Sequence, residues 1–449
     1  MRPRRATRPR PAGAGSGDAV GQVLELEVGP VAHGGHCVAR HEGRVVFVRH
    51  ALPGELVRAR VTEGGATKGF WRADAVEVLR AAPGRRPAPC PVARPGGCGG
   101  CDFQHATPAT QRDLKAAVVA EQLQRLAGLT LDVVVEPVDP GTVVGTAQEG
   151  LRWRRRTQFA VDAEGRPGLR RHRSHAVVPL RDCPISSEAV LGTGVLEQTW
   201  GGVETVEVAA GTDGPPLLVV HPAAGAHPRL PRAEDVSLAV RTPGGLHRVA
   251  GRTWVAETVR VRETDHAFRV SGAGFWQVHP QAAPTLAGAV LDALDPRPGD
   301  RCLDLYAGSG LFTAVLAEAV GLTGTVVAVE GEARAVKDAR RSLHGRDQVR
   351  LVVGDVARVL GTPDGPAGQE TGELVVLDPP RSGAGREVVG AIAARAPRVV
   401  AYVACDPAAL ARDVAWFAEL GYRLDGLRAF DLFPNTHHVE CVARLVPLG

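Results

Sequence analysis

The last two fifths of the chain alternate between helix-like and strand-like patterns, and this alternation constrains the fold more than any other feature. Repeated strand-helix units form a mostly parallel sheet with helices on both faces, and ligands bind at the carboxyl ends of its strands. The sequence therefore predicts a Rossmann-like α/β domain over residues 271–449. The expected segments are a helix at 281–294, a strand at 302–306, a helix from Leu311, and strands at 326–330, 349–353, 374–377 and 399–404.

Short apolar strands separated by glycine and proline turns occupy the front of the chain. Apolar and polar residues alternate over 22–28, and strand-like runs follow at 44–48 and 56–61. Short strands at this spacing are typical of a small β-barrel, which we expect over 18–80. Residues 1–17 are rich in arginine and proline without apolar periodicity, so they are expected to form a disordered basic tail.

The middle of the chain, 81–270, mixes helical and strand-like patterns and is predicted to be an α+β central domain, with a helix over 110–126. The sequence has no run of about 18 apolar residues and no apolar stretch typical of a secretion signal, so we expect a cytoplasmic protein outside any membrane. A net charge of +4 and a pI near 8.7 fit a polyanionic partner.

Arginines are concentrated within 22 residues of the central domain, where aromatic rings lie between them. Arginine with interleaved rings is the composition of a surface that grips phosphates and stacks bases. A solvated, charged sheet edge is the competing interpretation. The residues are Arg152, Arg154, Arg155, Arg156, Arg166, Arg170, Arg171 and Arg173, with Trp153, Phe159 and His172 among them.

Four of the eight cysteines suggest a metal site. Three of these four lie in a loop dense in proline and glycine, which needs something other than a hydrophobic core to hold it. In a reducing compartment, four thiolates bind either zinc or a four-iron cluster. The predicted ligands are Cys90, Cys98, Cys101 and Cys183. Three other cysteines are assigned to packing: Cys37, Cys302 and Cys441.

A glycine turn follows the strand at 302–306. Gly308 and Gly310 allow the backbone to approach a ligand closely, and Glu330, at the end of the next strand, is placed to accept the hydroxyls of a ribose. An NAD oxidoreductase would share these features. However, Thr313 stands where a third glycine is expected, and Asp304 lies inside the strand. This arrangement resembles class I methyltransferases, whose ligand is S-adenosylmethionine.

Cys405 follows the apolar run 399–404 and should lie at the open end of a strand, where a cysteine is a candidate nucleophile. Together with two further segments, its surroundings resemble the RNA 5-methyluridine methyltransferase family. The residues before position 80 similarly resemble the TRAM domain of that family's ribosomal RNA branch. The three motifs are Asp378-Pro379-Pro380-Arg381, Tyr402-Val403-Ala404-Cys405-Asp406-Pro407 and Phe433-Pro434-Asn435-Thr436-His437-His438-Val439-Glu440.

This resemblance implies a mechanism. Cys405 would add to carbon 6 of uracil, and Glu440 would remove the proton from carbon 5 after methylation. Asp406 stands where relatives often have asparagine, and we hypothesise that Arg381 or a helix dipole offsets its effect on the thiolate. The residues assigned to S-adenosylmethionine are Gln277, Tyr306, Gly308, Gly310, Glu330, Asp355 and Asp378.

The resemblance also bears on partners. It implies a [4Fe-4S] cluster at the four cysteines and 23S ribosomal RNA as substrate, with the enzyme expected to act as a monomer. The alternatives are a transfer RNA uridine-C5 methyltransferase, an amino-group methyltransferase acting on RNA or DNA, and a non-catalytic RNA-binding factor. An amino-group enzyme would need no cysteine, and a binding factor would need neither Cys405, Glu440 nor the glycine loop. An NAD oxidoreductase ranks last.

Overall fold

The computed structural model describes residues 19–65, 68–139, 150–230, 235–362 and 373–449. They divide into two compact units, one made of residues 19–32 and 36–85, the other of His33–Gly35 and the described residues after 85. The predicted tail at 1–17 lies outside the described residues. No helix in the described part of the chain is long and apolar enough to cross a membrane.

The first unit is a closed β-barrel, as predicted. Its strand order is β1-β2-β3-β5-β4, and every neighbouring pair except β3 and β5 is antiparallel. Apolar side chains of β1 at every second position are buried, because successive side chains of a strand point to opposite faces. The strands are β1 (Val23–Val31), β2 (Cys37–His41), β3 (Arg44–Arg49), β4 (Leu56–Glu63) and β5 (Phe70–Arg80).

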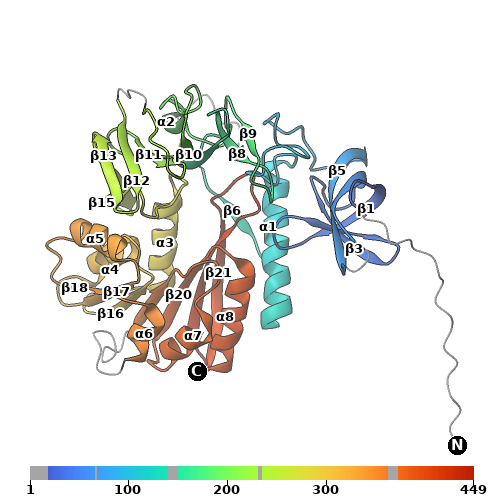
Figure 1. Cartoon of the computed structure of the whole chain (residues 1–449). Coiled ribbons are helices and arrows are strands. Elements are labelled where there is room, and N and C mark those ends of the chain that lie inside the picture. The colour runs from blue at the N-terminus through green and yellow to red at the C-terminus, as the bar shows by residue number, and fades with distance from the viewer. Residues whose placement is uncertain (1–18, 66–67, 140–149, 231–234, 363–372) are drawn as a thin grey trace, which may run out of the picture. The chain divides into compact units, whose positions relative to one another are not determined.

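The second unit contains the predicted doubly wound sheet (Figure 1). Its eight strands run in the order β18-β17-β16-β19-β20-β22-β21-β6, and the first five are parallel. The antiparallel strand β22 lies between β20 and β21. The strands are β16 (Arg301–Leu305), β17 (Thr325–Glu330), β18 (Val349–Val353), β19 (Leu374–Leu377), β20 (Val399–Ala404), β21 (Tyr422–Asp431), β22 (Glu440–Pro447) and β6 (Val135–Pro137).

Helices cover both faces of this sheet. Cys302 of β16 packs in one core cluster with α3 and α4, whereas Leu303 packs in the other with α6, α7 and α8. Successive side chains of β16 thus point to opposite faces of the sheet, and each face packs against one layer of helices. The helices are α3 (Ala282–Leu294), α4 (Leu311–Val320), α5 (Ala333–Ser342), α6 (Val356–Gly361), α7 (Gly385–Ala393) and α8 (Pro407–Glu419).

The middle of the chain forms a second, seven-stranded sheet in the order β13-β12-β11-β10-β7-β8-β9, and β14 and β15 form a separate hairpin. The predicted helix over 110–126 appears as α1 followed by a π-helical turn. The boundary proposed at residue 270 stays a prediction, but β6 belongs to the C-terminal sheet because it pairs with β21. The remaining elements are α1 (Pro108–Gln122), η1 (Leu123–Ala127), β7 (Arg156–Val161), β8 (Pro167–Arg170), β9 (Val177–Pro179), α2 (Glu188–Leu191), β10 (Val203–Ala209), β11 (Leu217–Pro222), β12 (Ser237–Thr242), β13 (Gly245–Ala250), β14 (Trp254–Val261) and β15 (Thr264–Ser271).

Candidate active site

Cys405 lies at the carboxyl end of β20, where the strand turns into α8. Asp406 caps that helix, because its Oδ1 accepts a hydrogen bond from the Ala409 amide at 2.9 Å. In the antiparallel pair of β20 and β22, Ala404 lies opposite Cys441. Cys405 follows Ala404 and Glu440 precedes Cys441, so the two residues lie close together where this pairing ends, and Glu440 raises the pKa of Cys405. Two residues 35 positions apart in the sequence are neighbours.

Asp378, at the end of β19, adds a second carboxyl group beside this pair. Burial raises the pKa of Asp378 to about 7. Burial also raises the pKa of Glu440 well above its usual range; Asp378 adds to the increase, and Arg381 opposes it. Glu440 is 5% exposed. The site therefore holds two carboxyl groups that keep protons more readily than ordinary acids do.

The pKa of the Cys405 thiol is raised to about 11. Burial is the largest cause, followed by Glu440 and Asp378, whereas Arg381 lowers the pKa and Asp406 raises it least. Arg381 lowers the pKa more than Asp406 raises it, as the hypothesis requires, but burial and the two buried carboxyl groups leave the pKa of Cys405 well above that of a free thiol, which counts against a thiolate favoured by Arg381. The net result is that Cys405 of the RNA-free enzyme is a thiol at neutral pH.

We expect alkylation of Cys405 by iodoacetamide to report this pKa. Because the thiolate is the nucleophile, the rate should rise about tenfold per pH unit between pH 7 and 10 without reaching a plateau. Glu440→Gln removes a carboxylate that raises the pKa, so it should speed alkylation throughout this range. Peptide mass spectrometry measures the rate at Cys405, with a short cysteine peptide as the control. A plateau below pH 9 would contradict the raised pKa.

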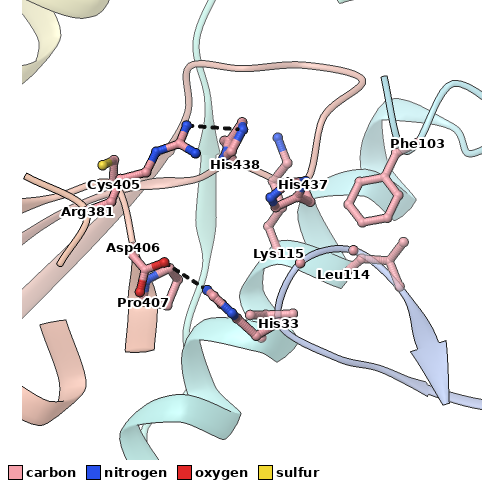
Figure 2. A pocket seen from close by; sticks show the side chains of 13 residues that line it. His33, Phe103, Leu114, Lys115, Arg381, Cys405, Asp406, Pro407, His437 and His438 are labelled. Carbon is pink, nitrogen blue, oxygen red and sulfur yellow. Dashed lines mark hydrogen bonds and ion pairs between the residues drawn. The ribbon is translucent and has the colours of Figure 1, made fainter. Parts of the chain in front are cut away.

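Cys405 opens onto a cavity of about 170 Å³, the Cys405 pocket. Figure 2 shows Arg381 with its guanidinium directed at His438 and Asp406 turned toward His33. Arg381 Nη2 is 3.4 Å from His438 Nε2, and Asp406 Oδ2 is 3.0 Å from His33 Nε2. Burial, His437 and Arg381 lower the pKa of His438 to about 3, so its ring is neutral. The lining residues are His33, Gly34, Gly35, Phe103, Leu114, Lys115, Val118, Arg381, Cys405, Asp406, Pro407, His437 and His438.

Asn435 fixes the turn that leads into β22, a role the sequence did not assign. It is fully buried and has a φ of 67°, in the left-handed region. Its Oδ1 accepts hydrogen bonds from Gln111 and Arg86 at 3.1 Å each, and its carbonyl oxygen accepts the Asp102 amide at 2.9 Å. Asp102 also bonds the His437 ring at 2.6 Å. The cysteine-rich loop and α1 therefore hold the segment that ends in Glu440. The only sequence feature that pointed to this structural role was the unusual number of polar residues in that segment.

Lys115 of α1 is also bound to this turn, by two hydrogen bonds. Its Nζ donates to Asp431 Oδ1 at 2.6 Å and to the Phe433 carbonyl oxygen at 3.1 Å, and its side chain has no exposed surface. Removing one partner of a buried ion pair leaves an uncompensated charge. We expect Lys115→Met to lower the free energy of unfolding by about 3–5 kcal/mol in chemical denaturation. Exposed Lys337→Met is the matched control, and equal stability of the two variants would contradict the expectation.

The glycine turn after β16 has the backbone that the sequence predicted. Gly308 and Gly310 have φ values of 54° and 90°. A side chain on Gly308 would meet nothing within 4 Å, so space is open beside the turn. Glu330 Oε2 accepts the Gly308 amide at 2.8 Å, which holds the carboxylate at the turn. Asp304 is fully buried and accepts a hydrogen bond from Thr313 at 2.5 Å; burial raises its pKa to about 7.

Of the other residues assigned to the cofactor, two lie near the glycine turn and one lies in another cavity. Asp355 caps α6 by accepting the Arg358 amide at 3.0 Å. Tyr306 follows β16 with a φ of 63°, and burial, then Asp355, raise its pKa to about 12. These two residues are thus neighbours. Gln277 instead lines a separate cavity of about 230 Å³ together with Glu257.

The four predicted cysteine ligands come together around one small cavity. Gln104 Nε2 donates to Cys101 Sγ at 3.2 Å, and the Gly100 amide donates to Cys98 Sγ at 3.3 Å. In the part of the chain that the structure describes, however, no group of three or more histidine, cysteine or acidic side chains could hold a metal ion. The structure therefore does not show the predicted cluster among the residues it describes. The three cysteines assigned to packing are buried: Cys37, Cys302 and Cys441.

The predicted arginine surface is only partly correct. Trp153 and Phe159 are buried, with 1% and 0% of their surface exposed, and cannot stack on RNA bases. Arg156 is also buried and donates to a backbone carbonyl, and Arg152 pairs with Asp182 at 2.7 Å. The sequence could not separate these residues because strand alternation and distant partners decide which arginines face solvent. The exposed remainder is Arg166, Arg170, Arg171 and Arg173.

The fold and the glycine turn define a class I methyltransferase domain joined to a small β-barrel. Comparison with family models agrees: residues 18–76 match the TRAM domain, and 369–446 match tRNA (uracil-5-)-methyltransferase. Residues 264–363 match protein-L-isoaspartate(D-aspartate) O-methyltransferase. A solved tRNA (uracil-54, C5)-methyltransferase of Pyrococcus abyssi, in complex with S-adenosyl-L-homocysteine, has a similar fold, with a TM-score of 0.68 at 22% identity over 94% of this chain and 100% of that one.

Two relatives cover nearly the whole chain. An uncharacterized RNA methyltransferase of Streptomyces avermitilis is 50% identical over 95% of this chain and 99% of its own length. Another, of Streptomyces coelicolor, is 52% identical over 95% of this chain and 93% of its own length. The chain belongs to the family of S-adenosylmethionine-dependent RNA (uracil-5-)-methyltransferases. It is an enzyme, and the oxidoreductase, amino-group and non-catalytic alternatives are set aside.

Proposed function

We propose that the enzyme methylates carbon 5 of a uridine in RNA through a covalent bond between Cys405 and carbon 6. The observation that carries this proposal is the pairing of Ala404 with Cys441, which brings Cys405, just after β20, close to Glu440, the first residue of β22. Carbon 5 of uracil is a weak nucleophile. When the Cys405 thiolate adds to carbon 6, the ring becomes an enolate whose carbon 5 can accept the methyl group.

The later steps require a base. After methyl transfer, carbon 5 carries both the methyl group and its original proton. Glu440 accepts that proton, the electrons re-form the double bond between carbons 5 and 6, and the sulfur of Cys405 leaves as a thiolate. A raised pKa makes the Glu440 carboxylate a stronger base than an ordinary glutamate. Arg381, which lowers the pKa of Cys405, favours the thiolate at the beginning and end of this cycle.

S-adenosylmethionine supplies an electrophilic methyl group when it is bound. The open space beside Gly308 and the Glu330 carboxylate at the end of β17 fit the adenosine part of such a ligand. At the end of β17, the Glu330 carboxylate is best placed to accept hydrogen bonds from the ribose hydroxyls. The set proposed for this ligand beside the glycine turn is Tyr306, Gly308, Gly310, Glu330, Asp355 and Asp378, and Gln277, which lines the cavity of about 230 Å³, completes the proposal.

The proposed substrate is 23S ribosomal RNA, methylated in the cytoplasm by a monomer. The TRAM domain and the four-cysteine loop support this choice, because their combination resembles the ribosomal RNA branch. Transfer RNA is the second candidate, since the solved P. abyssi protein is named for it. The target uridine must leave its base stack to reach a half-buried cysteine, so a single-stranded or loop segment is expected.

A [4Fe-4S] cluster remains our proposal for Cys90, Cys98, Cys101 and Cys183. The shared cavity and the N–H donors to two sulfurs support it. A single tetrahedral zinc ion would need all four sulfurs about 2.3 Å from one point. Anaerobically purified protein should contain four irons and four sulfides per chain and absorb broadly in the visible. A colourless preparation with one zinc per chain would overturn the proposal.

Nucleoside mass spectrometry tests the function directly. Ribosomal and transfer RNA are isolated from a strain lacking this gene and from the same strain carrying either the wild-type or the Cys405→Ala gene. We expect 5-methyluridine to disappear from 23S ribosomal RNA and to return only with the wild type. Loss from transfer RNA would reassign the substrate, and unchanged 5-methyluridine in both fractions would refute the proposed reaction.

A further inference from the structure

A polar groove of about 560 Å³ lies on the seven-stranded sheet, separate from the Cys405 pocket. Its volume falls within the range of about 300–1,000 Å³ typical of ligand sites. Three elements form it: the face of β7, β10 and β11, the turn between β8 and β9, and the loop that carries the cysteines. The lining residues are Gly99, Gly100, Gln158, Ala160, Leu169, Arg170, Arg171, His172, Arg173, Glu204, Thr205 and His221.

The strand register explains why the floor of the groove is polar. Thr205 of β10 lies opposite Ala160 of β7 and His221 of β11, so these side chains share one face of the sheet. Gln158 lies two positions from Ala160 on the same face and donates to Thr205 Oγ1 at 3.3 Å. The opposite face, with Phe159 among its residues, packs in a hydrophobic core. Thr205 is 8% exposed, so the exposed Gln158 amide is the main hydrogen-bonding group that the floor offers.

The rim of the groove carries most of the exposed arginines left from the predicted surface. Three of them, at 170, 171 and 173, line the groove together with one glutamate, Glu204, which lies 3.6 Å from Arg170. Arg171 and Arg173 are exposed at the turn, so positive charge gathers there. Guanidinium groups bind phosphate, and a carboxylate repels it. A strand of nucleic acid would therefore place its phosphates at the turn and its base edges near Glu204 and the floor.

The cysteine loop lines the groove directly beside the turn that carries the arginines. The Gly99 amide donates to the Arg170 carbonyl oxygen at 3.0 Å, and Cys98 forms a β-bridge with Arg171. A side chain on Gly99 would come within 2.5 Å of the His172 backbone nitrogen, so only glycine permits this approach. Gly99 and Gly100 lie between two of the predicted cluster ligands. The loop that brings the cysteines together is thus held against the turn that carries the arginines.

We infer that this groove binds a single-stranded segment of the RNA substrate outside the target uridine. Bases can stack on the guanidinium planes of the rim, while their edges reach Gln158 and Glu204. The inference rests on RNA being the substrate but not on the covalent mechanism. It also gives the four-cysteine loop a role in RNA binding that requires no electron transfer.

The test measures binding of a fluorescein-labelled, 20-nucleotide single-stranded RNA of mixed sequence by anisotropy, over a series of salt concentrations. The variant is Arg171→Gln with Arg173→Gln. The matched control is Arg386→Gln with Arg423→Gln, which removes the same charge from exposed positions on α7 and β21. We expect the groove variant to bind about tenfold or more weakly and the slope of log K against log salt to fall by about 1.4, since each single-strand phosphate contact contributes about 0.7.

The other outcomes are equally decisive. Equal affinity and equal slope for the groove variant and the control would overturn the inference. The same anisotropy measurement is made with labelled poly-glutamate. If the groove variant bound poly-glutamate more weakly than the wild type but kept the wild-type salt slope for RNA, the groove would be assigned to an acidic protein and the inference would be overturned. At saturating RNA the groove variant should methylate uridine at the wild-type kcat, with a raised KM. Absence of 5-methyluridine with the wild-type enzyme would refute the proposed reaction without bearing on the groove.

Discussion

Replacing Cys405 by alanine is expected to lower kcat/KM for uridine methylation by on the order of 10⁵-fold, the scale on which enzymes lose activity with their nucleophile. Without the sulfur, carbon 5 is not activated, although both substrates can still bind. The measurement is transfer of tritiated methyl groups to an RNA fragment, with affinity for the fragment recorded separately. Cys302→Ala, which removes a buried cysteine from the sheet, is the control and should keep nearly full activity.

Binding distinguishes a lost chemical step from a lost fold. Cys405→Ala should bind the fragment within about threefold of the wild-type affinity, since the removed sulfhydryl is small and half-buried. Activity within tenfold of wild type would show that carbon 5 is methylated without a cysteine adduct, and the proposed mechanism would then be abandoned.

Glu440→Gln should have an effect of similar size but at a later step. Methyl transfer proceeds, yet glutamine cannot accept the proton from carbon 5, so the bond between Cys405 and carbon 6 persists. The expected result is a protein-RNA species stable on a denaturing gel, carrying labelled methyl groups and absent from Cys405→Ala with Glu440→Gln. Turnover should fall by on the order of 10³-fold or more.

Glu419→Gln is the matched control, because Glu419 is exposed and pairs with exposed Arg386. It should release product at the wild-type rate. If Glu440→Gln released product at that rate too, the proton would have to go to another group, and Asp378, whose pKa is raised to about 7, would be the first to examine.

Much of the catalytic domain could be predicted from local sequence. The strands at 349–353, 374–377 and 399–404 have the predicted bounds, because continuous apolar runs between turn signals are typical of buried parallel strands. The glycine turn was also predictable, since few residues other than glycine adopt the positive φ of Gly308 and Gly310. Cys405 could be placed at a strand end for the same local reasons.

Contacts between distant segments could not be predicted in this way. Gln111 and Asn435 are 324 positions apart, and their hydrogen bonds depend on how α1 packs beside the turn before β22. The same holds for β6, whose three residues join a sheet formed mainly by the other end of the chain. Short polar segments carry no periodicity from which such partners can be inferred.

The sequence by itself determined the strand and helix pattern, the glycine turn and the chemistry available at Cys405 and Glu440, because these depend on residue type and local spacing. Only the tertiary structure decided which groups are neighbours and how much water reaches them. It raised the pKa of Cys405 to about 11 by burial and by the approach of Glu440, and it separated buried Arg156 from exposed Arg171. Burial and long-range electrostatics are properties of packed neighbours, and neighbours are set by the fold.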